Sequence, residues 1–123
     1  VYAGLILFSM PIKAQEVGPI DLDALMPPPP MMDLHAGLQL AYELEDQWSI
    51  IDYANAIAKY YPDTPFGQEA PYQCGETYFK MGQYELANDS FSQYLNMAKN
   101  PKHFEEVIHY KFAIAELFRG GVK

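Results

Sequence analysis

The chain has 123 residues, half of them apolar, and a formal net charge of −8 from 16 acidic and 8 basic residues. A chain of this length has room for one folded domain. Because Lys and Arg form no cluster, the composition argues against a nucleic-acid-binding protein and against binding to an anionic surface. The acidic residues are spread along the chain, which is typical of solvated helix faces and leaves a preference for basic partners open.

Residues 1–14 resemble part of a secretory signal. The run from Val1 to Met10 is apolar and uncharged, and Ala14 is a candidate cleavage position after Pro11. The run is about half as long as a bilayer-spanning helix. Since no initiator Met and no basic residues precede it, we interpret residues 1–14 as the remnant of a signal peptide. A buried strand or helix of the domain is the alternative.

Residues 15–32 are predicted to be a proline-rich linker. Pro19 and the block from Pro27 to Pro30 favour extended polyproline II backbone without internal hydrogen bonds. We expect a tether or spacer. A recognition peptide for an aromatic-lined groove is the alternative.

Two amphipathic helices are predicted between residues 33 and 63. Asp33 is the expected N-cap of the first helix, and the second, over residues 47–61, ends before Pro62. Apolar residues three and four apart define the inward face of each helix. The positions on these faces are Leu34, Leu38, Ala41, Tyr42 and Glu45 in the first helix, with Leu40 and Leu44 beside them, and Trp48, Ile51, Ala54, Ala58 and Tyr61 in the second.

A third and a fourth helix are predicted between residues 64 and 100. Thr64 is the expected cap and Pro65 the first helical residue, while Pro71 predicts a kinked but continuous helix. Gly82 is expected to take the left-handed conformation that ends this helix. The fourth helix runs from about Tyr84 to Lys99, with its inward face at Tyr84, Ala87, Phe91, Tyr94, Leu95 and Ala98.

A fifth helix is predicted from residue 101 onward. Asn100 is its expected cap and Pro101 lies in its first turn. Phe104, Ile108, Phe112 and Ala115 mark its apolar face, and the helix ends at Arg119 before two glycines.

Residues 72–95 place small and bulky side chains at the spacing that two antiparallel helices need to interlock, and this pattern resembles the tetratricopeptide repeat (TPR). Gly75 and Ala87 allow close helix approach, while Tyr78, Phe91 and Leu95 fill the space around the contact. The positions that carry the resemblance are Tyr42, Trp48, Gly75, Tyr78, Gly82, Tyr84, Ala87, Phe91 and Leu95, and Tyr42 matches Tyr78 at an interval of 36 residues.

The TPR resemblance implies an all-α, right-handed solenoid of antiparallel helix pairs that follows an irregular N-terminal segment. Repeat 1 would occupy residues 33–63, repeat 2 residues 64–100, and residues 101–123 would hold the first helix of an incomplete third repeat, about two and a half repeats in all. A fragment of a longer protein is the expected explanation for the missing partner helix. A short protein that offers its fifth helix to another subunit is the alternative.

Residues 46–119 are more specifically similar to the repeats of bacterial envelope proteins of the BamD and CpoB (YbgF) type. The similarity lies in a Tyr-Pro-Asp-Thr-Pro turn at 61–65, followed by a helix with Ala70, Tyr72 and Gly75. It implies an exported, periplasmic, non-enzymatic scaffold, at the inner face of the outer membrane, that binds protein components of outer-membrane assembly. BamD-like lipoproteins carry an acylated Cys after the signal, and no Cys lies near Ala14, so a lipid anchor is not expected.

Three other functional interpretations stay open. A CpoB-type protein would coordinate envelope constriction with cell-wall synthesis. A cytosolic TPR chaperone would shield secretion substrates and use Val1–Met10 as a docking segment. An enzyme with an accessory TPR would need a catalytic domain outside these residues.

The sequence shows no constellation that predicts catalysis, a cofactor or a small-molecule substrate. His35, His103 and His109 lack the spacing of metal ligands on one helix turn, and no phosphate-binding loop or nucleophile motif is present. The single cysteine, Cys74, is predicted to be a buried small hydrophobe.

If the TPR resemblance holds, the first helix of each repeat lines a concave groove that binds an extended or helical segment of a partner protein. The groove positions would be Glu69, Tyr72, Gln73, Glu76, Phe79 and Lys80, followed by Lys111, Phe112, Ala115 and Arg119. Tyr72 and Glu76 stand where carboxylate-clamp TPR proteins have Lys and Asn, so we do not expect a clamp. The alternative is that Tyr72 and Phe79 only pack between repeats.

Overall fold

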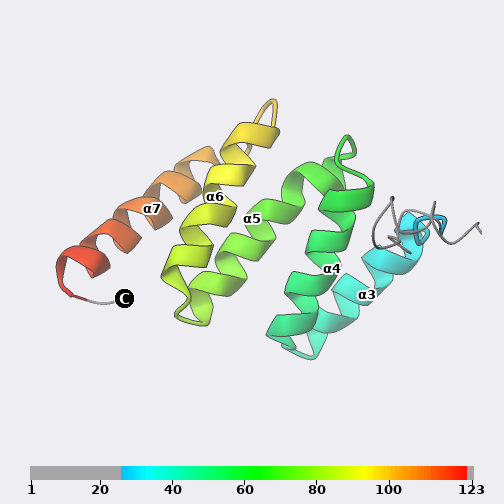
Figure 1. Cartoon of the computed structure of the whole chain (residues 1–123), viewed down its shortest axis with the longest axis horizontal. Helices are drawn as coiled ribbons and strands as arrows, with labels where there is room; N and C mark the ends of the chain where they lie inside the picture. The colour runs from blue at the N-terminus through cyan, green and yellow to red at the C-terminus, as the bar shows by residue number, and fades with distance from the viewer. Residues whose placement is uncertain (1–25, 122–123) are drawn as a thin grey trace, which may run out of the picture.

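The computed structural model describes residues 26–121 and shows five α-helices that lie side by side in chain order (Figure 1). The expected signal remnant, the linker up to residue 25 and residues 122–123 lie outside the described residues. Successive helices run antiparallel, and the prediction of an all-α fold is confirmed for the described part. The helices are α3 (Met31–Glu43), α4 (Gln47–Tyr60), α5 (Pro65–Lys80), α6 (Tyr84–Met97) and α7 (Phe104–Arg119).

Helix α5 is the centre of the fold, because it packs against α4 on one side and α6 on the other. Helix α3 covers α4 at one end of the array, and α7 covers α6 at the other end. Two hydrophobic clusters result, one on each side of α5. In the described residues no helix has the length and apolarity needed to cross a bilayer.

The first core is aliphatic and lies between α3, α4 and α5. Its buried members are small or branched side chains: Leu34, Leu38, Ala41, Ile50, Ala54, Ile57, Ala70 and Cys74. Burying such side chains stabilises a fold by roughly 25 cal/mol for each Å² removed from water. Cys74 is 2% exposed, so the prediction of a buried small hydrophobe is confirmed.

The second core is aromatic and lies between α5, α6 and α7. Its buried members are Tyr72, Ala87, Phe91, Tyr94, Val107 and Ile114. Phe91 stacks on Tyr110 with ring centroids 4.8 Å apart, and Tyr72 packs at a tilt against both Phe91 and Tyr94. Tilted and offset ring pairs of this kind add to the stability that burial supplies.

The two hairpin turns, α3–α4 and α5–α6, share one backbone hydrogen-bond pattern. In the first, Glu45 N–H donates to Tyr42 O and Asp46 N–H to Ala41 O; in the second, Gly82 N–H donates to Phe79 O and Gln83 N–H to Tyr78 O. The expected left-handed Gly82 is confirmed at φ 80°, and Glu45 takes the same conformation at φ 54°. Tyr42 is therefore equivalent to Phe79, and the equivalence of Tyr42 with Tyr78 is corrected by one residue.

In each hairpin a glycine lies under a ring from the following helix. A Cβ on Gly75 would come within 2.4 Å of the Phe91 ring, and a Cβ on Gly37 within 2.3 Å of the Tyr53 ring. Both rings therefore sit closer to the helix backbone than any larger residue allows. The role expected for Gly75 is confirmed, whereas that of Gly37 was missed.

The start of α3 differs from the prediction. The helix begins at Met31, with Pro30 as its N-cap, so Asp33 lies in the first turn and does not cap it. The Pro30 carbonyl accepts the N–H groups of Asp33 and Leu34, which lets the extended proline block lead directly into the helix. The same block is held to the end of α4, because Tyr61 Oη donates to the Pro29 carbonyl at 2.6 Å.

The predicted start of α5 is confirmed. The Thr64 side chain accepts a hydrogen bond from Gly67 N–H at 3.0 Å, and Pro65 is the first helical residue. The helix continues through Pro71, which is buried, to Lys80. Its continuity is thus confirmed, and the kink at Pro71 stays a prediction.

The connection between α6 and α7 corrects a second cap prediction. Helix α6 ends at Met97, two residues early, and α7 begins only at Phe104, so Asn100 is not its cap. The chain is first anchored at His103, whose backbone N–H donates to Tyr94 Oη at 3.0 Å. The expected end of α7 at Arg119, followed by Gly120, is confirmed.

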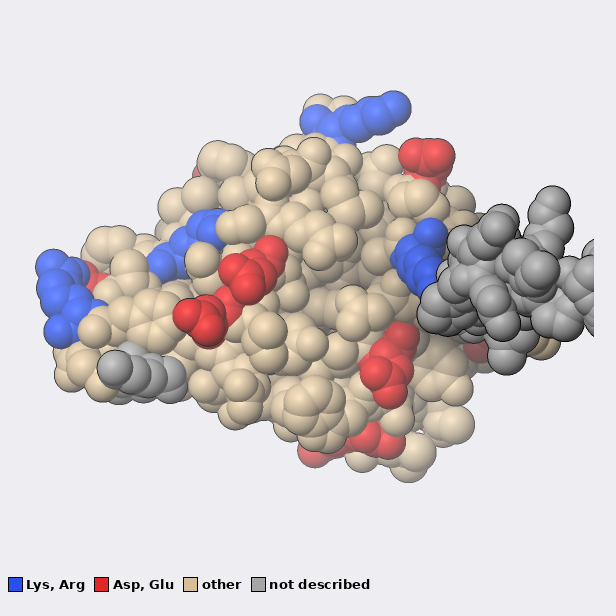
Figure 2. Space-filling view, viewed as in Figure 1, with Lys and Arg blue, Asp and Glu red and all other residues tan. Residues whose placement is uncertain are grey.

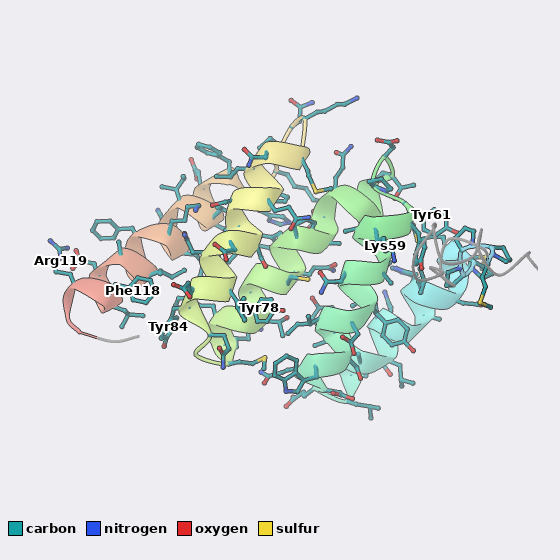
Figure 3. The ribbon with its side chains drawn as sticks, in the orientation of Figure 1. Lys59, Tyr61, Tyr78, Tyr84, Phe118 and Arg119 are labelled. Carbon is teal, nitrogen blue, oxygen red and sulfur yellow. The ribbon has the colours of Figure 1, made fainter. Side chains whose placement is uncertain are left out.

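Three predicted inward faces are wrong in part. In α3, Leu34, Leu38 and Ala41 are buried, but Tyr42 and Glu45 are exposed. Val107 and Ile114 are the buried residues of α7, while the predicted stripe of Phe104, Ile108, Phe112 and Ala115 is exposed. Trp48 is 58% exposed because α4 turns Ile50, Ile51, Ala54 and Ile57 inward instead. Phe118 and Arg119 likewise project from the free end of α7 (Figure 3).

Candidate functional site

One side of α5 is left uncovered by α4 and α6. Glu69, Gln73, Glu76 and Lys80 recur at intervals of three and four residues, so they form one row along the helix, and none of them is buried. All four belong to the groove positions predicted from the sequence. The row lies between α3 and α7, and we call this side of the molecule the open face.

Glu76 is held in place at the middle of the row by two tyrosines. Its Oε2 accepts hydrogen bonds from Tyr72 Oη and Tyr110 Oη, both at 3.1 Å. Burial, and then the nearby Glu76 carboxylate, raise the pKa of both tyrosines, because each effect disfavours a phenolate. The hydrogen bond from Tyr110 joins α7 to α5, while the one from Tyr72 lies within α5.

His103 makes a second link between α7 and the row. Its Nε2 lies 2.5 Å from Glu69 Oε2 and its Nδ1 lies 3.5 Å from Glu106 Oε2. The imidazole is stacked flat on the Tyr72 ring, with centroids 4.0 Å apart. The Glu106 backbone and then the His103 side chain hold the pKa of Glu106 below its usual value. His103 is therefore an interhelix residue that joins the start of α7 to α5.

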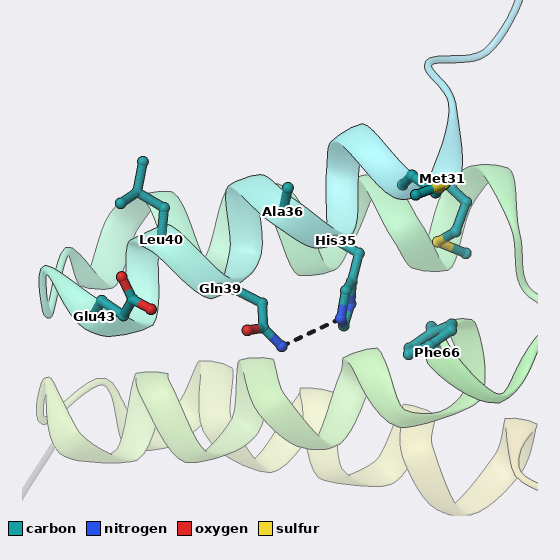
Figure 4. Close-up of a pocket in the computed structure, with 8 residues that line it drawn as sticks. Met31, His35, Ala36, Gln39, Leu40, Glu43 and Phe66 are labelled. Carbon is teal, nitrogen blue, oxygen red and sulfur yellow. Dashed lines mark hydrogen bonds between the residues drawn. The ribbon is translucent and has the colours of Figure 1, made fainter.

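A hollow of about 530 Å³ lies between α3 and the start of α5 (Figure 4). Its walls are mainly apolar: Met31, Met32, Ala36, Leu40 and Phe66, with His35, Gln39 and Glu43 as the polar groups. His35 points from α3 toward α5, packs its ring 4.7 Å from Phe66, and shares a hydrogen bond with Gln39. We call this space the Met hollow.

A more polar hollow of about 410 Å³ adjoins the Met hollow and shares His35 and Phe66 with it. It continues along α5 past Glu69 and Gln73 to the segment that connects α6 and α7, where Asn100 and Lys102 line it. The two hollows therefore form one trough that starts on α3 and crosses α5.

Smaller hollows flank the far end of the row. One of about 280 Å³ lies between α5 and α7 and is lined by Phe79, Glu106, His109, Tyr110 and Ala113. Another, of about 380 Å³, is lined by Tyr42, Glu45, Gln47, Ile50, Thr77 and Lys80 at the α3–α4 turn. Helices α3, α5 and α7 thus share a furrowed open face.

The two aromatic groove candidates on α5 serve mainly as packing. Tyr72 is 7% exposed and lies in the second core. Phe79 is half-buried and meets Tyr84 and Tyr110 edge to face. For Tyr72 the structure therefore supports packing between helices, the alternative noted from the sequence, while Phe79 packs and also lines a hollow.

The groove candidates on α7 lie away from the hollows. Lys111 faces α6, where its Nζ donates to Asn88 Oδ1 at 2.8 Å and to Ser92 Oγ at 2.6 Å. Phe112 and Ala115 are exposed elsewhere on α7, and Arg119 pairs with Glu116 at the helix end. The residues of α7 that line a hollow are Glu106, His109, Tyr110 and Ala113, which the sequence reading missed.

A regular interval marks the correct α7 positions. Glu69 meets His103 and Glu76 meets Tyr110, and both pairs are separated by 34 residues. The same interval from Phe79 leads to Ala113, which shares a hollow with it. Counting 34 residues from Glu69, Glu76 and Phe79 therefore leads to α7 residues beside them, whereas the same interval from Gln73 and Lys80 leads to the buried Val107 and Ile114.

The charges of the open face are mostly acidic. The acidic residues that line the hollows or the row are Glu43, Glu45, Glu69, Glu76 and Glu106, and the basic residues are Lys80 and Lys102. On the face shown in Figure 2, basic side chains are scattered singly and form no continuous patch. The open face therefore favours cationic over anionic groups in whatever binds there.

The described residues contain little that reacts. Burial raises the pKa of the Cys74 thiol to about 12, so this thiol stays protonated near neutral pH and is a poor nucleophile. Among residues 26–121, no three His, Cys, Asp or Glu side chains are grouped as metal ligands. What the arrangement offers is a shaped surface with fixed hydrogen-bonding groups.

The chain matches no family model, no curated protein and no solved structure.

Proposed function

We propose that this chain is a non-enzymatic scaffold that binds a segment of a partner protein on its open face, and that its helices form a right-handed TPR-type solenoid. The observation that carries the proposal is the trough on the side of α5 that no neighbouring helix covers. It combines hollows of about 530 and 410 Å³ with an uncovered row of polar side chains. Furrows of this kind between helices accept the side chains of an extended or helical segment.

The solenoid part of the proposal is supported by the likeness of the two hairpins. Both have the same turn hydrogen bonds and a left-handed residue at the same point, and both place a ring over a glycine. Helix pairs that repeat in this way and pack only on their neighbours in the chain are the building units of solenoids. Helices α3, α5 and α7 would be the first helices of successive repeats.

We further propose that the scaffold works in the bacterial cell envelope, in outer-membrane protein assembly of the BamD kind. This setting is supported by the similarity of residues 46–119 to that family and by the signal-like composition of residues 1–14. A reporter fused behind residues 1–30, with an initiator Met and basic residues added before Val1, would test this setting. Processing near Ala14 and export support the setting, whereas a reporter retained in the cytosol contradicts it.

A pull-down from envelope extract tests the open face as the binding surface. Gln73→Ala/Lys80→Glu alters two uncovered positions on α5 and leaves the buried Tyr72 in place. Asn96→Ala/Lys99→Glu makes the same chemical changes at exposed positions near the end of α6 that line none of the hollows described. We expect recovery of a specific protein to fall at least tenfold for the first variant and to stay unchanged for the second. Equal recovery with both variants contradicts the proposal.

A further inference from the structure

The Met hollow exposes more apolar side chain than the rest of the open face. Met32 is 82% exposed, Leu40 54% and Phe66 47%, and all three line the same space. Large apolar side chains gathered in one hollow mark a docking surface more often than isolated exposed ones do. Methionine is flexible and polarisable, so Met31 and Met32 can adapt to the shape of an incoming side chain.

The shape of the Met hollow suits a helix. Its lining residues on α3 run from Met31 to Glu43, a helix length of roughly 18 Å, or about three turns. Met32, Ala36 and Leu40 lie four residues apart, and this spacing makes a ridge against which a second helix packs. The hollow opens into the polar hollow at His35 and Phe66, so an occupant is not confined to one end.

The charges around the Met hollow point to a cationic occupant. Among residues 26–121, Glu43 is the only charged residue that lines it. Residues 31–46 hold Asp33, Glu43, Glu45 and Asp46 and no Lys or Arg. Next along the trough lie Glu69 and, at its far end, one basic residue, Lys102. Basic groups on an occupant would therefore meet carboxylates, whereas acidic groups would be repelled.

We infer that the Met hollow binds the apolar face of an amphipathic helix from a partner protein, and that Lys or Arg side chains flank this face. The inference rests on the proposed function, because it names the chemistry of the segment that the open face receives. Leu, Met or Phe side chains of the segment fill the space between Met32, Leu40 and Phe66. Its basic flank lies along Glu43 and Glu69.

Synthetic helices provide the probe. The first is an 18-residue Leu/Lys peptide with Leu at positions i, i+3, i+4 and i+7. The second has the same composition in an order without an apolar face, and the third replaces every Lys by Glu. Binding is followed with protein labelled at the methionine methyl groups. We expect the first peptide to shift the Met31 and Met32 signals, to leave Met81 unmoved, and to bind at least tenfold tighter than the other two.

Two variants locate the binding. Met32→Glu/Leu40→Glu places carboxylates on exposed wall positions and is expected to weaken binding of the first peptide at least tenfold. Trp48→Glu alters an equally exposed residue outside the hollow and should have no effect. Circular dichroism and thermal unfolding of both variants verify that the fold is kept.

Binding of the Leu/Glu peptide as tight as that of the Leu/Lys peptide, or unchanged binding to Met32→Glu/Leu40→Glu, overturns the inference. Failure of the Leu/Lys peptide to bind also overturns it. Failure of this inference can be distinguished from failure of the proposed function. If the envelope partner is lost with Gln73→Ala/Lys80→Glu but retained with Met32→Glu/Leu40→Glu, the open face stands and the Met hollow is not its anchor.

Discussion

The two hairpins share a backbone but differ in chemistry. The α3–α4 turn has Glu45 in the left-handed conformation, where the α5–α6 turn has Gly82. The α3–α4 side packs aliphatic and small side chains, whereas the α5–α6 side packs rings. The comparison teaches that the helix arrangement follows from a few shared constraints, namely a left-handed turn residue and a glycine under a ring, and not from one type of core.

The aromatic core is also tied to the open face, whereas the aliphatic core is not. Tyr72 and Tyr110 bring hydroxyl groups from the second core to Glu76, and Tyr72 carries the stacked His103 that reaches Glu69. A change in the packing of these rings should therefore disturb the row on α5. No side chain of the first core makes such a link in the described residues.

The largest expected effect is loss of the fold at alkaline pH. Burial raises the pKa of Cys74 to about 12 in the first core, and raises those of Tyr72, Tyr94 and Tyr110 in the second. All these groups are neutral in both states below about pH 7.5, because an unfolded cysteine has a pKa of about 8.5 and an unfolded tyrosine one of about 10. Above it the unfolded chain loses protons first, so the free energy of unfolding should fall steadily toward pH 12.

Urea unfolding measured from pH 7 to pH 11 checks the predicted loss of stability, and two variants distinguish the contribution of the first core from that of the second. Cys74→Ala should flatten the pH dependence from about pH 8 upward, and Tyr72→Phe should flatten it from about pH 9 upward. A free energy of unfolding that stays constant up to pH 11 would show that these groups are not buried as described.

The next largest effects should come from removing the ring that lies over each glycine, and the loss of stability should differ between the two hairpins. Phe91 is fully buried, so Phe91→Ala should lower the free energy of unfolding by about 3–5 kcal/mol. Tyr53 is only partly buried, so Tyr53→Ala should cost clearly less. Equilibrium urea unfolding provides both values, and equal losses would contradict the difference in burial.

Replacing the glycine under each ring by alanine should destabilise the protein less than removing the ring does. The α5–α6 hairpin should again lose more stability than the α3–α4 hairpin. Gly75→Ala drives a methyl group into the immobile Phe91 ring and should cost about 1–3 kcal/mol. Gly37→Ala meets the ring of Tyr53, which is only partly buried, and should cost less. Thermal unfolding of the two variants side by side measures the difference. A larger loss of stability for Gly37→Ala than for Gly75→Ala would contradict the conclusion that the ring in the α5–α6 hairpin is held more tightly.

Exchanging the left-handed turn residues should give the smallest effects, with opposite signs. Glu45→Gly relieves a conformation that is unfavourable for residues with a Cβ and should stabilise the protein by up to about 1 kcal/mol. Gly82→Ala introduces that cost and should destabilise by about 1 kcal/mol, since no neighbouring atom otherwise obstructs a Cβ there. Changes of the same sign in both variants would contradict the equivalence of the turns.

Local rules predicted much of the fold from the sequence. Thr64 with Pro65 marks a helix start and Gly82 a helix end, because cap chemistry depends on neighbouring residues only. Asn100-Pro101 has the same cap chemistry, but the helix start predicted from it was wrong. There the start of α7 is fixed by Tyr94 and Glu69, which contact His103 from other helices.

The faces of the end helices were harder to predict. Apolar residues in α7 form two rows, one through Phe104, Ile108 and Phe112 and one through Val107 and Ile114. Both rows have helical periodicity, so the pattern alone does not tell which row packs on α6. The error in the face of α7 carried over to Lys111 and Phe112 as groove candidates. Of the α5 candidates, Glu69, Gln73, Glu76 and Lys80 lie on the open face, while Tyr72 is buried in the second core.

Site-specific photo-crosslinking tests the central claim that the open face is where a partner protein binds. A photoreactive residue is placed at Gln73 in the trough or at Asp89, an exposed position of α6 that lines none of the hollows described, and each protein is irradiated in envelope extract. The account predicts that Gln73 captures one protein, identified by mass spectrometry, and that Asp89 captures none. Capture from Asp89 alone, or equal capture from both positions, would contradict it.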